Sequence, residues 1–154
     1  MNHRALAATF KIIGTFEDGG KLSDSFDFDE TNFVTPYINV NIETSGGTFL
    51  GADYIDADGS LTFGDEFGFV LDDNSGVFGL TIDFDGILTN TTTELDLLSS
   101  SLEEDFFSEF GDARNLMSGS IEKVPEPLTI VGSFIALGMG TVFKNKKQQS
   151  LTRK

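Results

Sequence analysis

The residues with the clearest spacing for chemistry are three acids around a glycine turn. When Gly59 is aligned with the turn glycine of a helix-flanked calcium loop, Asp56 and Asp58 fall on the third and fifth loop positions. Both of these are ligand positions. Tyr54, however, occupies the first ligand position, and Asp65 stands where such loops place a bidentate glutamate. Two interpretations therefore stay open: a calcium site, or a hairpin turn with solvated carboxylates.

Catalytic side chains are otherwise scarce. The chain has no cysteine, which excludes disulfides, thiolate nucleophiles and cysteine-ligated zinc. Its one histidine, His3, lies at the start of the chain, so we expect no histidine general base in the body. Paired carboxylates can hydrolyse glycosides, but among 25 acids no pair stands out by its spacing. We expect no enzymatic activity and no cofactor other than the calcium considered above.

The charge changes sign sharply along the chain. Residues 1–127 hold all 25 acids and five of the ten bases, a net charge of −20, whereas residues 128–154 hold five bases and no acid. An acidic body does not favour nucleic acid as a partner, because phosphate binding needs a basic face. The contrast predicts that the two parts occupy different surroundings.

The body, residues 8–123, has the alternation of apolar and polar residues that is typical of β-strands. Turn signals such as Asp58-Gly59 and Asp85-Gly86 separate the alternating runs. We expect an all-β fold, an antiparallel β-sandwich or flattened barrel with phenylalanine in its core. About nine strands are predicted, at residues 9–16, 22–28, 34–44, 48–55, 61–63, 67–71, 78–84, 94–98 and 116–124.

One segment favours a short helix near 102–110. Ser101 and Glu104 form a capping box, and Leu102, Phe106 and Phe110 recur at a spacing of four residues. Gly111 follows as a stop signal. We expect this helix to pack on the sheet.

The C-terminal segment predicts a membrane helix. Residues 128–143 carry no charge and precede a basic cluster of Lys144, Lys146 and Lys147. Sixteen helical residues span about 24 Å, short of the ~30 Å hydrocarbon core, and snorkelling lysines can cover the difference. The positive-inside rule then places the tail, residues 144–154, in the cytoplasm and the acidic body on the other side. The alternative is a core segment of a soluble fold.

These parts, in this order, resemble the PEP-CTERM sorting signal of Gram-negative bacteria, including cyanobacteria. The Pro125-Glu126-Pro127 motif at 124–127, the apolar segment and the basic run follow one another as that signal requires. The resemblance implies processing by an exosortase, a membrane-embedded protease, with Pro125, Glu126 and Pro127 recognised and not catalytic. It further implies an exported, membrane-anchored or cell-surface protein, often in organisms with extracellular polysaccharide.

The body also resembles cyanobacterial members of that family, in Gly14-Thr15-Phe16, in residues 23–29 and in residues 37–44. A carbohydrate- or calcium-binding module with the same anchor is the alternative function. The chain has no tryptophan to stack on sugars, and its only tyrosines are Tyr37 and Tyr54.

The N-terminus departs from the family pattern, which includes a secretion signal. Residues 1–7 lack an apolar core, yet Ala5-Leu6-Ala7 matches the end of a signal peptide. We therefore expect residues 1–7 to be the remnant of a signal peptide whose start lies upstream of Met1. An in-frame stop codon immediately before Met1 would contradict this expectation.

Overall fold

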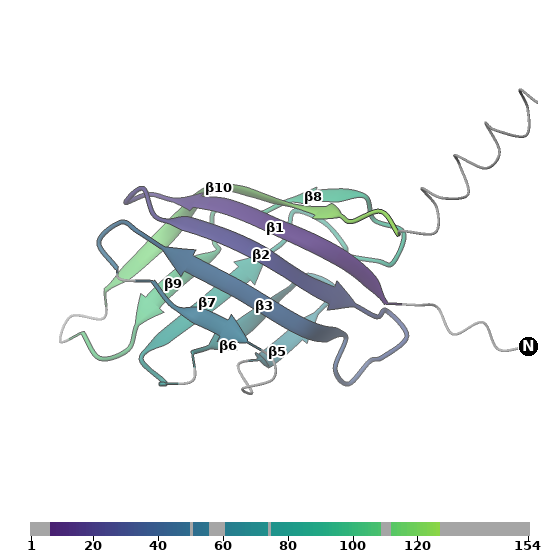
Figure 1. Ribbon diagram of the computed structural model, residues 1–154, viewed down its shortest axis with the longest axis horizontal. Helices are drawn as coiled ribbons and strands as arrows, with labels where there is room; N and C mark the ends of the chain where they lie inside the picture. The colour runs from purple at the N-terminus through teal and green to yellow at the C-terminus, as the bar shows by residue number, and fades with distance from the viewer. Residues whose placement is uncertain (1–6, 50, 56–60, 74, 109–111, 127–154) are drawn as a thin grey trace, which may run out of the picture. The chain divides into compact units, whose positions relative to one another are not determined.

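The computed structural model describes residues 7–49, 51–55, 61–73, 75–108 and 112–126, and within these ranges its secondary structure is entirely β (Figure 1). The chain divides into two compact units, Met1–Val124 and Pro125–Lys154. The first unit contains all the strands. The predicted membrane helix at 128–143 lies outside the described residues, as do Lys144, Lys146 and Lys147. Within the described ranges, no helix is long and apolar enough to cross a membrane.

Ten antiparallel strands form a single curved sheet. In chain order they are β1 (Ala8–Phe16), β2 (Lys21–Phe28), β3 (Tyr37–Ser45), β4 (Asp53–Ile55), β5 (Leu61–Asp65), β6 (Gly68–Asp72), β7 (Phe78–Asp83), β8 (Glu94–Asp96), β9 (Leu102–Asp105) and β10 (Ala113–Lys123). The order across the sheet is β4-β3-β2-β1-β10-β9-β7-β6-β5, with β8 paired to β10. The prediction of an all-β antiparallel fold is confirmed.

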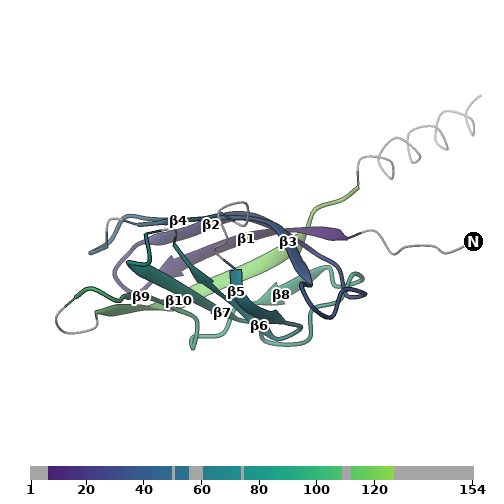
Figure 2. The same ribbon diagram turned by 90° about the horizontal axis from the view of Figure 1, so that it is seen from below.

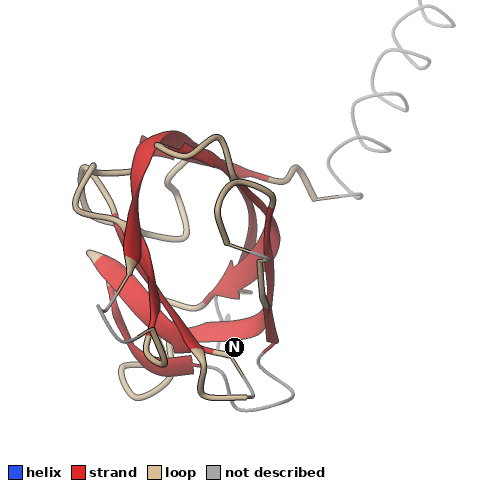
Figure 3. Cartoon of the chain, turned by 90° about the vertical axis from the view of Figure 1, so that its left-hand side faces the viewer, coloured by secondary structure: helices blue, strands red, loops and turns tan. Residues whose placement is uncertain are grey.

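The long strand β10 connects the two halves of the sheet. Its residues 113–115 pair with β9, and from Leu116 to Lys123 it pairs with β1. As a result, β1 to β4 form one layer, and β6, β7 and β9 form the facing layer (Figure 2). Seen along the strands, the sheet wraps almost into a barrel (Figure 3).

Among the described residues, no ladder of backbone hydrogen bonds joins the two edges of the sheet, β4 and β5. Instead, the Tyr37 hydroxyl on β3 donates a hydrogen bond to the Asp65 carbonyl at the end of β5, at 2.6 Å. Gly64 permits this approach, because a Cβ there would lie 2.5 Å from the Tyr37 ring. One side-chain contact thus joins the β3 side of the sheet to β5.

Apolar side chains fill the space between the layers, as the alternation predicts. Phe26 lies at the centre, with its ring centroid 5.3 to 6.4 Å from those of Phe10, Tyr37, Phe69 and Phe84. The aromatic cluster draws on both layers, so it holds them together. The expectation that phenylalanine forms the core is confirmed.

The predicted helix near 102–110 is wrong. Leu102–Asp105 is strand β9, which pairs with β7 and with β10, and the chain then turns at Phe106. The capping-box and spacing signals are local, whereas two neighbouring strands supply hydrogen bonds on both edges of this segment. Residues 109–111, which include Phe110 and Gly111, lie outside the described residues.

The two ends of the barrel differ. Strand β10 finishes at one end, which we call the exit end. The β2–β3 loop (29–36) lies at the exit end because Phe28 pairs with Ala8, and Phe10 pairs with Lys123. The β7–β8 loop (84–93) joins it, since the Lys123 N–H donates to the Thr93 carbonyl at 2.8 Å.

The β5–β6 turn (66–67) also belongs to the exit end, because the Leu88 N–H donates to the Glu66 carbonyl at 2.8 Å. The opposite end, which we call the turn end, holds the turn at 17–20 and the described residues 46–49, 51–52, 75–77 and 106–108 of three other connections.

Candidate functional site

Two charged side chains form a buried pair inside the turn end. Glu103 on β9 and Arg114 on β10 are direct register partners, and their side chains are 0% and 1% exposed. The Arg114 Nε donates to Glu103 Oε2 at 2.6 Å. The Arg114 Nη2 lies 2.5 Å from the same oxygen, without the alignment of a hydrogen bond. Such a pair is tolerated in a core only when further hydrogen bonds complete it.

The other carboxylate oxygen of Glu103 receives those bonds. Thr44 on β3 donates its hydroxyl to Oε1 at 2.5 Å, and Tyr54 on β4 donates its hydroxyl at 2.8 Å. Burial, and then the neighbouring Glu103 charge, raise the pKa of Tyr54 far above its usual range, so this phenol remains a donor. Glu103 therefore connects β9 to two strands of the facing layer.

The far end of the Arg114 guanidinium reaches the turns of that same end. Nη1 donates to the Gly46 carbonyl at 2.6 Å and lies 3.3 Å from Asp18 Oδ2. The Phe16 ring lies 4.3 Å from the guanidinium carbon and the Phe49 ring 5.0 Å, within the range of cation–π attraction. One arginine thus joins the β1–β2 and β3–β4 turns.

Asp18 is held ionised by its own turn, by the β3–β4 turn and by Arg114. Burial alone would raise its pKa, but hydrogen bonds from the Gly20 N–H, from the Thr48 N–H and hydroxyl, and the nearby Arg114 charge hold the pKa well below its usual range. Gly20 is required for packing: a Cβ there would lie 2.0 Å from Arg114 Nη1.

Chemically, this network is a structural centre and not a reaction centre. Both Glu103 oxygens already accept donors, and the residue is sealed from solvent. A substrate therefore has no open path to the carboxylate. Sequence reasoning missed this centre because it placed Glu103 on a helix. One signal was present: Arg114 is one of five bases in a body of 25 acids.

The calcium candidates are not brought together within the described chain. Asp56 and Asp58 lie outside the described residues. Asp65 ends β5, where its Oδ1 accepts the Phe67 N–H at 2.9 Å, as in an ordinary turn. Across the described ranges, no group of three or more acidic or histidine side chains is placed to hold a metal ion.

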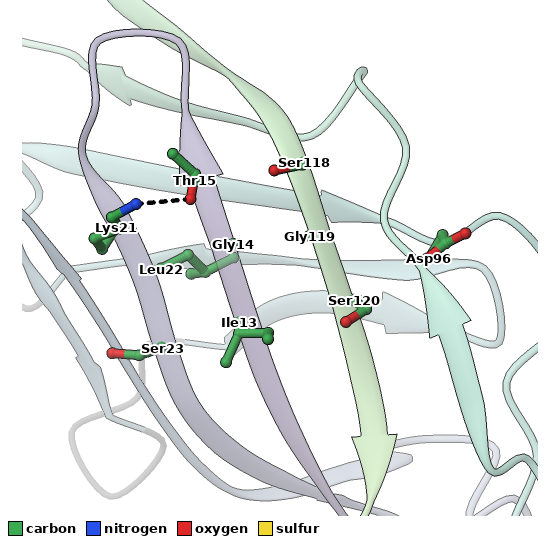
Figure 4. Close-up of a pocket in the computed structure, with 10 residues that line it drawn as sticks. All are labelled: Ile13, Gly14, Thr15, Lys21, Leu22, Ser23, Asp96, Ser118, Gly119 and Ser120. Atoms are coloured by element: carbon green, nitrogen blue, oxygen red, sulfur yellow. Dashed lines mark hydrogen bonds between the residues drawn. The ribbon is translucent and has the colours of Figure 1, made fainter.

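A shallow hollow of about 590 Å³ lies on the outer face of β2, β1 and β10, beside Asp96 of β8 (Figure 4). It exists because small residues meet there: Gly14 faces Gly119 across the strands, and Ser118 and Ser120 flank the gap. The lining offers hydroxyls, one lysine and one carboxylate, and no aromatic ring for a sugar.

Neither tyrosine offers a sugar platform, since Tyr37 and Tyr54 are both buried in the core. The hollow's serines have no histidine beside them to act as a general base. The described surface thus shows no arrangement typical of nucleophilic catalysis around this hollow.

The segment predicted to be a sorting motif begins where the sheet ends. The Val124 N–H donates to the Thr9 carbonyl at 2.8 Å, and Pro125 and Glu126 follow as exposed residues. Proline has no N–H, so neither Pro125 nor Pro127 can extend the pairing of β10 with β1. Pro127 itself lies outside the described residues.

Comparison with known proteins returned nothing: no protein-family model, no curated protein and no solved structure matches this chain.

Proposed function

We propose that the chain is a non-enzymatic, exported β-protein that a PEP-CTERM-type signal sorts to the cell surface. In this proposal an exosortase-type protease recognises Pro125, Glu126 and Pro127, and residues 128–143 hold the chain in the membrane until it is processed. The acidic body then faces the exterior, where association with polysaccharide is the role that the resemblance suggests.

The observation that carries the proposal is the position of the motif. The last described backbone hydrogen bond of the sheet is made by Val124, and the exposed Pro125 follows it directly. A protease cleft needs extended and accessible backbone, and two prolines discourage both helix and strand pairing there. The motif can therefore be engaged without opening the barrel.

The distribution of charge supports the orientation. A body of net charge −20 is well solvated in an aqueous exterior, and five bases after residue 143 suit an anionic cytoplasmic leaflet. The bases and the apolar segment occur in the order required for a stop-transfer anchor.

The interior of the body supports a non-enzymatic role. Its buried charged groups, Glu103 and Arg114, are engaged with each other and with the turns that they join. We therefore assign a structural role to these buried charged groups.

The proposal can be tested by following the size of the full chain in two bacterial strains that differ only in possessing an exosortase. We expect a shortened chain only in the strain with the enzyme. A Pro125→Ala/Pro127→Ala variant should remain full-length in both strains, while a Pro36→Ala control, far from the motif in sequence, should be shortened as the wild type is. Equal sizes in the two strains would contradict the proposal.

A further inference from the structure

Among the large apolar side chains that the structure describes, the two most exposed lie where the chain leaves the barrel. Phe33 and Val34, in the β2–β3 loop, are 94% and 88% exposed. Ile87, in the β7–β8 loop, and Phe67, in the β5–β6 turn, are also more than half exposed. All four belong to the exit end.

Two of these residues, Phe33 and Ile87, belong to one surface. Phe33 and Ile87 line a common hollow of about 280 Å³, together with the buried Phe28 and Leu88. The β2–β3 and β7–β8 loops are fixed to each other, because the Asn90 N–H donates to Glu30 Oε2 at 2.9 Å. The Lys123 Nζ donates to the Asn90 carbonyl at 2.5 Å, which ties β10 to the same loops. An exposed apolar surface on loops that are held in place by hydrogen bonds is typical of a site that binds a protein or a membrane.

The short chain after β10 limits the distance between the exit end and the surface that the apolar segment enters. Only residues 125–127 separate Val124 from the apolar segment at 128–143. Three extended residues reach about 10 Å. The headgroup layer on each side of the hydrocarbon core is about 5 to 8 Å thick. With residues 128–143 in a bilayer, Val124 therefore lies at or just above the headgroups.

From these observations we infer that the exit end rests on the membrane, with Phe33, Val34 and Ile87 placed in the interface of the lipid bilayer. The inference rests on the proposed function, since it requires residues 128–143 to enter the membrane. Aromatic and aliphatic side chains gain by entering the interface, to a depth of about 5 to 10 Å.

The acids of the exit end determine the kind of lipid that fits. Glu30 and Asp65 line the hollow beside Phe33, and Glu66 lies in the adjacent turn. Among the bases, Lys123 contacts these loops through its bond to the Asn90 carbonyl. An anionic lipid surface would repel this end, so apolar insertion into a zwitterionic interface drives the contact.

The absence of tryptophan allows a direct test in the full chain. Three single-tryptophan variants, Phe33→Trp, Phe107→Trp and Ile135→Trp, would be placed in nanodiscs of ordinary or brominated phosphatidylcholine. Bromine quenches only tryptophans at membrane depth. Phe107 is the matched control, because it is 74% exposed and lies at the turn end. Ile135 lies within the predicted anchor.

We expect the Phe33→Trp and Ile135→Trp variants each to lose about half or more of their emission in brominated lipid, and the Phe107→Trp variant to lose none. A quenched Ile135→Trp variant with unquenched Phe33→Trp would overturn the docking and leave the anchor standing. Equal quenching of the Phe33→Trp and Phe107→Trp variants would also overturn it. An unquenched Ile135→Trp variant would overturn the anchor and the docking together.

Discussion

Glu103 and Arg114 face each other across β9 and β10 as register partners, and their side chains form the buried ion pair of the barrel. The pair lies where β10 begins, just before this strand changes partner from β9 to β1. Through Thr44 and Tyr54, Glu103 also contacts the facing layer. The contacts therefore connect the two layers at the turn end, as the Tyr37–Asp65 contact does at the edges.

Removing the charge of Glu103 should destabilise the barrel strongly. A Glu103→Gln variant keeps the shape of the side chain but removes the anion closest to the buried Arg114 charge and leaves Asp18, 3.3 Å away, as the remaining ion-pair partner. We expect a loss of about 3–5 kcal/mol in the free energy of unfolding, measured by urea denaturation. Glu104→Gln on the same strand is the control, and its exposed side chain should change stability by less than about 0.5 kcal/mol. Equal effects of the two variants would show that the ion pair is unimportant.

A methyl group added at Gly20 should destabilise the fold only while Arg114 is present. In Gly20→Ala the new Cβ would lie 2.0 Å from Arg114 Nη1, so the guanidinium must shift away from Gly46 and Asp18. We expect a cost of about 1–3 kcal/mol. In an Arg114→Met background the same change should cost much less, as a double-mutant cycle would show. Additive effects of the two substitutions would contradict the packing role of Gly20.

The low pKa of Asp18 makes part of the stability depend on pH. The folded state holds this proton less readily than the unfolded chain, whose aspartate titrates near its ordinary value of 3.8. The contribution is therefore complete above about pH 5 and is lost as the pH falls through 3.8 towards the folded pKa. The difference in unfolding free energy between wild type and Asp18→Asn should shrink between about pH 6 and pH 3. A difference that stays constant over this range would contradict the assignment.

Both tyrosines should resist ionisation while the barrel is folded. Burial raises the pKa of Tyr37 and Tyr54 well above the usual range, and neighbouring carboxylates, Asp65 and Glu66 at Tyr37 and Glu103 at Tyr54, add to the shift. Because the folded state retains these protons, it loses stability as the pH rises above the unfolded value of about 10. Phenolate absorbance should appear only together with unfolding, followed by circular dichroism. Phenolate formation near pH 10 in a folded chain would be the contrary result.

The strands were predictable because their pattern is local. Val40 and Ile42 alternate with polar residues, as a sheet with one buried face requires, and β3 forms there. The predicted alternation does not extend to Ile38, because the pairing of β2 with β3 shifts register beside it and Tyr37 is buried instead. The glycine turns between runs likewise set the hairpins of neighbouring strands.

Strand β9 and the buried centre were not predictable in the same way. From the sequence alone, Glu103 fits the first turn of a helix, and only its pairing with Arg114 explains its burial. Arg114 in turn contacts Asp18, which lies 96 positions away in sequence. A charged residue inside a barrel breaks the apolar alternation from which strands are predicted. The burial of Glu103 depends on partners from three other strands, β3, β4 and β10, and no local pattern contains that information.

The sorting proposal is tested most directly by mass spectrometry of the mature chain isolated from the surface fraction of the native host. It predicts a C-terminus at or near Pro127, with residues 128–154 missing. A surface-fraction chain that still ends at Lys154 would contradict it.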